Sequence, residues 1–154
     1  MISAQGMNPK MKLSIRDMGP RDYDTVIDLW ARAGLEHHPH GRDSREAILK
    51  DLASDTANFF LAELEGKVVA SALCTHDGRK GWINRLAVLP EFQRMGIAKM
   101  MIAESERRLA EKGLGMFCSM IWEDNLSSRA LFESEGYELV SGVAYYRKKL
   151  RPDY

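Results

Sequence analysis

The sequence has few cysteines, no long apolar run and no excess of either charge, and each of these absences excludes a class of protein. Only two of its 154 residues are cysteines, Cys74 and Cys118, which excludes a disulfide-rich scaffold. Both lie in apolar stretches, so we expect buried free thiols. No apolar run approaches the ~20 residues that a membrane-spanning helix needs. The 22 basic and 22 acidic residues cancel and are mixed along the chain, so there is no basic stripe of the kind that binds nucleic acid. We therefore expect a cytoplasmic protein, with no membrane and no nucleic acid as partner.

A chain of this length fits one domain with a substantial core. Internal repeats and low-complexity linkers are also missing, which favours a single domain over residues 12–150. Residues 1–11 have no hydrophobic periodicity and are predicted to be a flexible N-terminal extension.

The most informative stretch runs from Ile83 to Lys99. It predicts a short apolar strand that ends at Pro90, then a turn, and then a helix that begins at Ile97. The first N–H groups of such a helix have no intrahelical partner, and the helix dipole adds about half a positive charge there. Gly96 lets the backbone approach an anion closely. The stretch therefore predicts a seat for the phosphate or pyrophosphate of a bound cofactor.

Hydrophobic periodicity and turn residues predict the other elements. Helices are predicted over residues 21–33, 44–54, 97–112 and 125–135, and strands over 13–16, 58–64, 67–75, 82–89, 116–122, 137–140 and 144–150. The strand over 67–75 is apolar along most of its length, so we expect both of its faces to be buried. Ser44 and Asp124 are predicted helix N-caps. The order indicates an α/β fold, with a mixed sheet of about seven strands flanked on both faces by about four helices.

Two motifs carry a resemblance to a known family. Residues 93–98, Gln-Arg-Met-Gly-Ile-Ala, match a Q/R-x-x-G-x-G/A signature, and residues 125–137 are similar to an N-x-x-A-x-x-L-Y-E-K-x-G-F block. Both are motifs of the GCN5-related N-acetyltransferase (GNAT) superfamily, and the resemblance extends over roughly residues 12–150. It implies a single domain in which two central parallel strands splay apart and the arm of acetyl-CoA inserts between them.

The resemblance also implies a set of cofactor contacts. The strand before the turn would offer backbone groups to the pantetheine arm, the turn and helix start would wrap the pyrophosphate, and the last helix would line the channel near the sulfur. Arg94 and Lys99 could add charged donors. The implied cofactor-binding residues are Leu86, Ala87, Val88, Arg94, Met95, Gly96, Ile97, Ala98, Lys99, Asn125 and Phe132.

The chain departs from the family at the acid and base positions. The family commonly has a tyrosine where this chain has Phe132, and a phenyl ring cannot protonate the leaving thiolate. Tyr137, Tyr145 and Tyr146 follow it, but at strand positions where packing is the expected role. A glutamate that some members carry five residues before the motif asparagine is here Met120. The base is therefore left open between a water chain and a carboxylate.

Glu36 and Glu123 are the two carboxylate candidates for that base. Glu36 belongs to a stretch with three histidines, His37, His38 and His40, whose spacing on a proline-containing loop does not suit a metal site. No metal is expected. By the resemblance, this loop walls the acceptor pocket, where Glu36 would attract an amine.

The predicted function is direct transfer of an acetyl group from acetyl-CoA to a primary amine on a small molecule or a peptide. No covalent acyl-enzyme is expected, because neither cysteine lies at a motif position. An alternative is a non-catalytic acyl-CoA-binding sensor or regulatory module of the same fold, which the missing acid and base would suit. Dimerisation is common in the family, which leaves a homodimer open.

Overall fold

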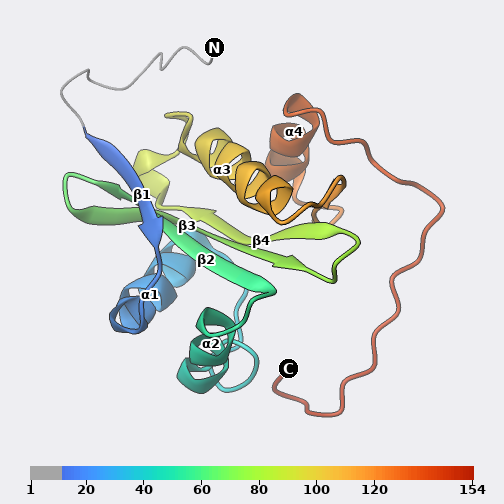
Figure 1. The fold of residues 1–154 in the computed structure, drawn as a ribbon, viewed down its shortest axis with the longest axis horizontal. Helices are drawn as coiled ribbons and strands as arrows, with labels where there is room; N and C mark the ends of the chain where they lie inside the picture. The colour runs from blue at the N-terminus through green and yellow to red at the C-terminus, as the bar shows by residue number, and fades with distance from the viewer. Residues whose placement is uncertain (1–11) are drawn as a thin grey trace.

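The computed structural model of the chain describes residues 12–154, so the predicted extension over 1–11 lies outside the described part. At its centre is one five-stranded sheet with the strand order β1-β2-β3-β4-β5 (Figure 1). Neighbours from β1 to β4 are antiparallel, whereas β5 runs parallel to β4. The strands are β1 (Leu13–Asp17), β2 (Ala57–Leu64), β3 (Lys67–His76), β4 (Gly81–Val88) and β5 (Phe117–Cys118).

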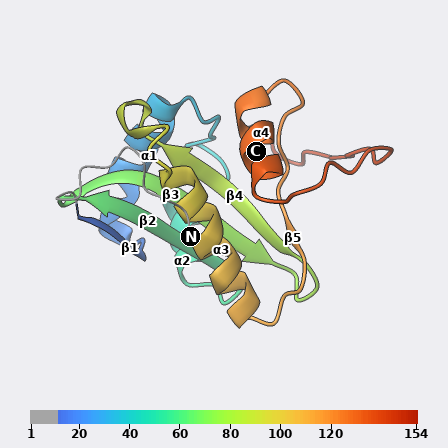
Figure 2. The ribbon, with the colours of Figure 1, turned by 90° about the horizontal axis from the view of Figure 1, so that it is seen from above.

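Helices cover both faces of the sheet, as predicted. The helices α1 and α2 lie on one face, α3 lies on the other, and α4 lies beyond α3 on the side of β5 (Figures 1 and 2). The serine at position 44 caps α2 as expected, because its Oγ accepts a hydrogen bond from the N–H of Ala47 at 3.2 Å. The helices are α1 (Tyr23–Ala33), α2 (Arg45–Leu52), α3 (Ile97–Glu111) and α4 (Leu126–Ser134).

The core lies between the sheet and these helices. On β3, residues 69–74 are all buried, which confirms that the apolar strand is covered on both faces. Trp30 of α1 is fully buried on one side of the sheet, and Met101 and Ile102 of α3 are buried on the other. Burial of these side chains holds β3 and β4 in place, and the candidate site is built on the end of β4.

Three predicted strands are wrong in whole or in part. The stretch 116–122 forms only the two-residue β5, and Met116, Met120 and Trp122 are 52%, 60% and 64% exposed. Residues 137–140 and 144–150 form no strand at all. Since β5 is so short, it offers almost no ladder to a further strand, and an isolated strand pair is marginal in water.

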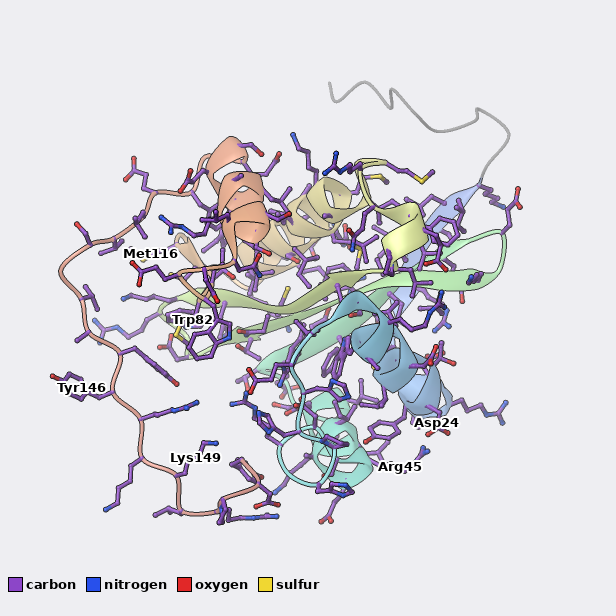
Figure 3. All side chains as sticks on the ribbon, turned by 180° about the vertical axis from the view of Figure 1, so that it is seen from behind. Asp24, Arg45, Trp82, Met116, Tyr146 and Lys149 are labelled. Atoms are coloured by element: carbon purple, nitrogen blue, oxygen red, sulfur yellow. The ribbon has the colours of Figure 1, made fainter. Side chains whose placement is uncertain are left out.

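The chain beyond Tyr137 therefore runs away from the sheet, and its end returns to the loop between α1 and α2, where the backbone of Asp153 lies against Gly41 (Figure 1). Figure 3 shows Tyr146 and Lys149 on this extended segment, well separated from the sheet. We call residues 138–150 the C-terminal segment. Its apolar side chains are between 67% and 90% exposed, and they are Leu139, Val140, Val143, Tyr145, Tyr146 and Leu150.

Smaller predictions also need correction. The N-cap of α4 is Asn125 and not Asp124, because the Asn125 Oδ1 accepts a hydrogen bond from the N–H of Ser128 at 3.1 Å. Cys74 is buried, but Cys118 is only half-buried because β5 lies at the edge of the sheet. Among the described residues, no helix is long and apolar enough to cross a membrane.

Candidate functional site

A wide groove opens where β4 and β5 separate. The two strands pair only at their starts, Gly81 with Phe117 and Trp82 with Cys118. Farther along, the Oγ of Ser119 donates to the backbone oxygen of Ile83 at 3.0 Å, and no further β4–β5 pairing follows in the described chain. The rest of β4 therefore presents one edge of its backbone to the groove rather than to a neighbouring strand.

The edge that faces the groove includes three of the predicted cofactor-binding residues. Leu86, Ala87 and Val88 all line the groove, and the last two are 6% and 7% exposed. The backbone oxygen of Val88 accepts a hydrogen bond from Nε2 of Gln93 at 3.1 Å, so the end of β4 is tied to the turn that follows. An extended ligand could pair with this edge as an added strand does.

The turn after β4 presents unpartnered amides at the start of α3. Arg94 and Gly96 have positive φ angles of 63° and 80°, and Gly96 is the N-cap residue of α3. Without a side chain, Gly96 cannot cap the helix, so the first amides of α3 have no side-chain acceptor. A Cβ added at Gly96 would meet nothing within 4 Å, so the side of the turn where a Gly96 side chain would stand is open. Such a concave run of N–H groups suits an anion.

The predicted turn residues divide into groove-lining and core positions. Arg94, Gly96, Ala98 and Lys99 line the groove, as does Ile97, although its side chain is 1% exposed and belongs to the core. Met95 packs against the core, so only its backbone could serve a ligand.

Lys99 has a structural partner that the sequence did not indicate. Its Nζ lies 3.4 Å from Oε1 of Glu135, which joins the start of α3 to the end of α4. Lys99 lies on the rim of the groove next to the open helix end, and Glu135, which also lines the groove, balances its charge there.

The helix α4 forms the opposite wall. Phe132 lines the groove, is 5% exposed, and packs edge-on against Tyr137 with ring centroids 5.0 Å apart. The hydroxyl of Tyr137 donates to Oε1 of Glu106 on α3 at 2.9 Å. Burial and this carboxylate raise the pKa of Tyr137, so its hydroxyl stays protonated and bound to α3. Packing is therefore the role of Tyr137, as the sequence predicted, although it lies in no strand. For Tyr145 and Tyr146, which are 67% and 90% exposed, the predicted packing role is wrong.

Asn125 and Glu123 lie where α4 begins. Both line the groove. Because the Oδ1 of Asn125 is used as the helix cap, its Nδ2 is the group that could donate to a ligand. The backbone oxygen of Glu123 accepts a hydrogen bond from Nη1 of Arg129 at 2.9 Å, so this donor of Arg129 is already used within the protein.

The loop between α1 and α2 also lines the groove. Glu36 lines it with a side chain that is 64% exposed, and His38 Nε2 lies 3.4 Å from its carboxylate. His37 is turned back to the backbone oxygen of Leu35 at 2.8 Å. Glu36 and Glu123 thus line one groove together with the β4 edge. Within residues 12–154, no group of three or more His, Cys, Asp or Glu side chains is placed to hold a metal ion.

Sequence reasoning missed one ion pair that joins this loop to β4. Nη2 of Arg85 lies 2.6 and 2.8 Å from the two carboxylate oxygens of Asp43, which is 4% exposed. Burial lowers the pKa of Arg85, and the Asp43 carboxylate opposes this change. A signal was present, because Arg85 is the only charged residue from Ile83 to Leu89, a stretch that is apolar apart from Arg85 and Asn84. A charge in a buried strand needs a partner.

Comparisons with known sequences agree with the motifs. The sequence model of the Acetyltransferase (GNAT) family matches residues 23–137. An acetyltransferase of Pectobacterium atrosepticum is 32% identical over 131 residues, which cover 85% of this chain and 92% of that protein. An acetyltransferase of Photorhabdus laumondii is 33% identical over 126 residues, or 82% of this chain and 87% of that protein.

Solved structures share the fold at lower identity. The aminoglycoside N-acetyltransferase AAC(6')-Iy in complex with CoA has a TM-score of 0.76 at 22% identity, over 93% of this chain and 99% of that chain. The PaiA N-acetyltransferase from Thermoplasma acidophilum in complex with coenzyme A has a TM-score of 0.73 at 18% identity, over 84% and 91% of the two chains.

Proposed function

Because the chain belongs to the GNAT family of acetyltransferases, we propose that its groove binds acetyl-CoA and transfers the acetyl group directly to a primary amine. The observation that carries this proposal is the unpaired edge of β4 beside the uncapped start of α3. The edge offers backbone pairing to an extended arm, and the helix start offers amides to a pyrophosphate. The two recognition elements follow each other along the chain, as the arm and the pyrophosphate do in the cofactor.

Each group of the chain has a definite task in this proposal. The amides from Arg94 to Lys99 hold the pyrophosphate, and Asn125 and Phe132 border the arm near its sulfur. A backbone N–H of the stretch 86–88 donates to the thioester oxygen as it becomes an oxyanion. A neutral amine forms the new C–N bond, the C–S bond breaks, and the amine proton leaves to solvent or to a carboxylate. A thiol with a pKa near ~8.5 is a good leaving group, so Phe132 need not supply an acid.

Direct transfer is further supported by the state of the cysteines. Burial raises the pKa of the Cys74 thiol, which keeps it protonated and unreactive. Cys74 also lies in β3 with its Sγ 3.9 Å from the backbone oxygen of Ser105, on the α3 side of the sheet. Cys118 lines the groove, but at the point where β4 and β5 are still paired.

We infer that the acceptor is a small molecule or a peptide with a cationic amine. Glu36 and Glu123 both line this groove and would attract such a group. Neighbours of the same fold include aminoglycoside acetyltransferases, which makes aminoglycosides the first class to test. Either glutamate is also a candidate base for the amine proton.

The first experiment is a melting curve with and without acetyl-CoA. Binding to the native state alone stabilises it by about 2.7 kcal/mol at a hundredfold excess over Kd. For a domain of this size we expect Tm to rise by roughly 5–10 °C. Acetate and free adenosine at equal concentration are controls, since neither spans both parts of the site. No rise at millimolar acetyl-CoA would contradict the proposed function.

A second experiment separates an enzyme from a sensor module of the same fold. A thiol reagent reports CoA release while amines are added one class at a time: aminoglycosides, amino acids, simple amines and peptides with free N-termini. An enzyme releases CoA only when its acceptor is present. If CoA is never released although acetyl-CoA binds, the non-catalytic alternative is favoured. That alternative has one observation in its support, the lack of a tyrosine hydroxyl at Phe132.

A further inference from the structure

A single arginine connects the loop over residues 35–43, here called the acceptor loop, to the groove edge of β4. Besides Asp43, the Arg85 guanidinium reaches the backbone oxygen of Glu36, to which Nη1 donates at 2.8 Å. The side chain thus contacts both ends of the loop. Asp43 continues the network, because its Oδ2 accepts a hydrogen bond from the N–H of His38 at 2.8 Å. Its backbone oxygen accepts one from the hydroxyl of Tyr23 on α1.

The backbone of Arg85 has an unusual conformation for a strand residue. Between the pairs Ser71–Ala87 and Leu73–Asn84, β4 has two residues where β3 has one, so Arg85 lies in a β-bulge. Its φ angle is 51°, a left-handed value that costs free energy in any residue with a side chain. The bulge directs the Arg85 side chain to the loop, while the residues after it form the edge that faces the groove.

A second layer of buried groups fixes the bulge. Ser71 is fully buried, and its Oγ donates to the backbone oxygen of Arg85 at 2.9 Å while accepting from Nε1 of Trp30 at 2.9 Å. The Trp30 ring also lies under the guanidinium, with its centroid 5.3 Å from the Arg85 Cζ. Bulge, arginine and loop therefore form one connected unit rather than separate surface contacts.

We propose that Arg85 is a positioning residue for the acceptor amine. Through its contacts with Asp43 and Glu36 it fixes the acceptor loop, and hence the Glu36 carboxylate, at a set distance from the acyl-transfer edge at residues 86–88. This inference rests on the proposed function for its chemical meaning. The geometry of the loop itself is measurable without any acceptor.

The chain contains a second arginine–aspartate pair outside the groove, which is more exposed and whose arginine also donates from Nε to Oε1 of Glu63 at 2.8 Å. Arg16 donates to both carboxylate oxygens of Asp22 at 2.8 Å, and Asp22 also accepts a backbone N–H, that of Gly19 at 2.8 Å. Neither Arg16 nor Asp22 lines the groove. A difference between the effects of the two pairs therefore reports location and not the loss of an arginine–aspartate pair as such.

The test compares Arg85→Met/Asp43→Asn with Arg16→Met/Asp22→Asn. Each double variant removes both charges of its pair together, which avoids leaving Arg85 or Asp43 buried alone. In the control, Glu63, which is 22% exposed, also loses its partner Arg16. Methionine keeps an apolar chain on Trp30, and asparagine keeps an oxygen for the His38 amide. We measure acetyl-CoA affinity by calorimetry, hydrogen–deuterium exchange of residues 35–43, and kcat and KM for the amine that releases CoA fastest in the acceptor screen.

The expected result is specific to the groove pair. Acetyl-CoA affinity changes by no more than about twofold in both variants, because the pyrophosphate seat is separate. Only Arg85→Met/Asp43→Asn speeds exchange in the acceptor loop and lowers kcat/KM for the amine by about 100-fold, since small displacements of reacting groups cost that much. Arg85→Lys keeps the charge but has only one donor nitrogen, so we expect an intermediate loss of kcat/KM.

Unchanged loop exchange in the Arg85→Met/Asp43→Asn variant would overturn the proposal. So would an equal loss of kcat/KM in the Arg16→Met/Asp22→Asn control, which would mean a general effect of stability. If wild-type protein fails to bind acetyl-CoA, the proposed function fails instead, and the exchange data still decide whether Arg85 holds the loop.

Discussion

Gly96 shows how one residue can serve both backbone geometry and ligand access. Its φ of 80° suits glycine. Because Gly96 is the N-cap, the α3 amides have no side-chain acceptor, and a Cβ added at this residue would meet no atom within 4 Å. A side chain here would fill the place proposed for the pyrophosphate. The residue is therefore the most direct point at which to test the cofactor site.

We predict that Gly96→Glu abolishes acetyl-CoA binding, because the new carboxylate occupies the seat and repels phosphate. Gly78 offers a matched control, since it has the same φ of 80° and the same open surroundings but lies in the β3–β4 turn outside the groove. Calorimetry should show no detectable binding for Gly96→Glu and near-wild-type affinity for Gly78→Glu. Equal affinities in the two variants would remove the site assignment.

Phe132 raises a different question, because a ring without a hydroxyl stands where the family commonly has a tyrosine. We predict that Phe132→Tyr keeps kcat or raises it, the rise occurring if protonation of the leaving thiolate limits the rate. Tyr137→Phe is the reciprocal variant and should leave kcat unchanged, since that hydroxyl is bound to Glu106. A large fall in kcat for Phe132→Tyr would mean that the buried ring has no room for a hydroxyl. A fall for Tyr137→Phe would make Tyr137 the acid.

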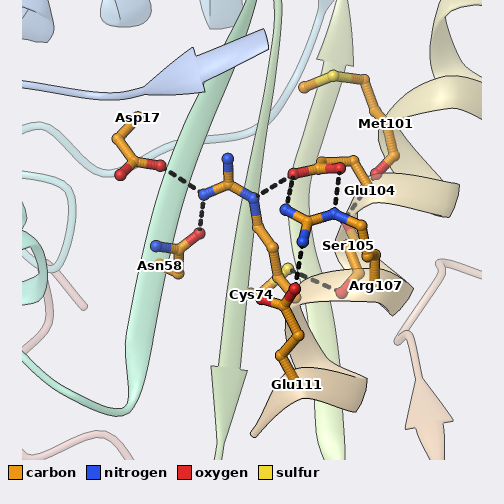
Figure 4. Close-up of polar contacts among 9 residues, drawn as sticks. Asp17, Asn58, Cys74, Met101, Glu104, Ser105, Arg107 and Glu111 are labelled. Atoms are coloured by element: carbon orange, nitrogen blue, oxygen red, sulfur yellow. Dashed lines mark hydrogen bonds and ion pairs between the residues drawn. The ribbon is translucent and has the colours of Figure 1, made fainter.

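At the scale of elements, α3 is joined to the sheet by a charged cluster on the face away from the groove. Arg108 lies at its centre and donates to Asp17 of β1, Asn58 of β2 and Glu104 on its own helix (Figure 4). The guanidinium also lies 4.4 Å from the centroid of the Phe60 ring. The cluster fixes the distal half of α3, while the start of the same helix stays open for a ligand.

Because of this cluster, the free energy of unfolding should depend on pH in the acidic range. Hydrogen bonds from Arg107, and also from Arg108, lower the pKa of the Glu104 carboxyl from 4.5 to about 2. Since the folded pKa is the lower one, the stabilisation is complete above pH 4.5 and is lost as pH falls toward 2. We predict that Glu104→Gln costs about 1 kcal/mol at pH 7, a value that allows for solvent screening.

Urea midpoints measured from pH 7 down to pH 3 test this directly. The difference between wild type and Glu104→Gln should shrink steadily below pH 4.5. Glu111→Gln is the control on the same helix, because Glu111 is 66% exposed and pairs only with Arg107 among the described residues. Its effect should be small at every pH. A Glu104→Gln difference that does not change with pH would contradict the charge argument.

Elements with strong local signals were predictable, and those that depend on distant neighbours were not. The strand before the glycine turn, α3 and α2 with its Ser44 cap follow from periodicity and capping chemistry, which act within a few residues. The short β5 and the irregular C-terminal segment do not, because a strand exists only if another strand pairs with it. The tyrosines at 145 and 146 are residues that strands favour, but the stretch 144–150 has no ladder to join.

The candidate site divides in the same way. The phosphate seat was predictable, since one contiguous stretch makes the turn and the helix start. The link from Arg85 to Asp43 spans 42 positions in the sequence. It also needs a β-bulge at Arg85, and no local sequence pattern there predicts that conformation. Only the presence of a charge in a buried strand indicated that a partner had to exist.

At the scale of the whole molecule, the C-terminal segment differs from the rest of the domain in how much apolar surface it exposes. The domain buries its apolar residues around one sheet, yet this segment exposes aromatic and aliphatic side chains along most of its length. Exposed apolar stretches in extended chain are ready to pair with another chain. We therefore propose that a second copy of the protein covers the segment, which would make the homodimer the working form.

Limited proteolysis at several protein concentrations tests this arrangement. Trypsin should cut first at Arg147, Lys148 or Lys149, which are exposed in the C-terminal segment. If a second copy covers the segment, cleavage there slows as protein concentration rises, whereas cleavage in the exposed β3–β4 turn at Arg79 keeps its rate. Light scattering at the same concentrations should show the mass doubling over the range in which protection appears. A constant cleavage rate together with a monomeric mass would mean that no second copy binds the segment, and the apolar side chains would then need a different occupant.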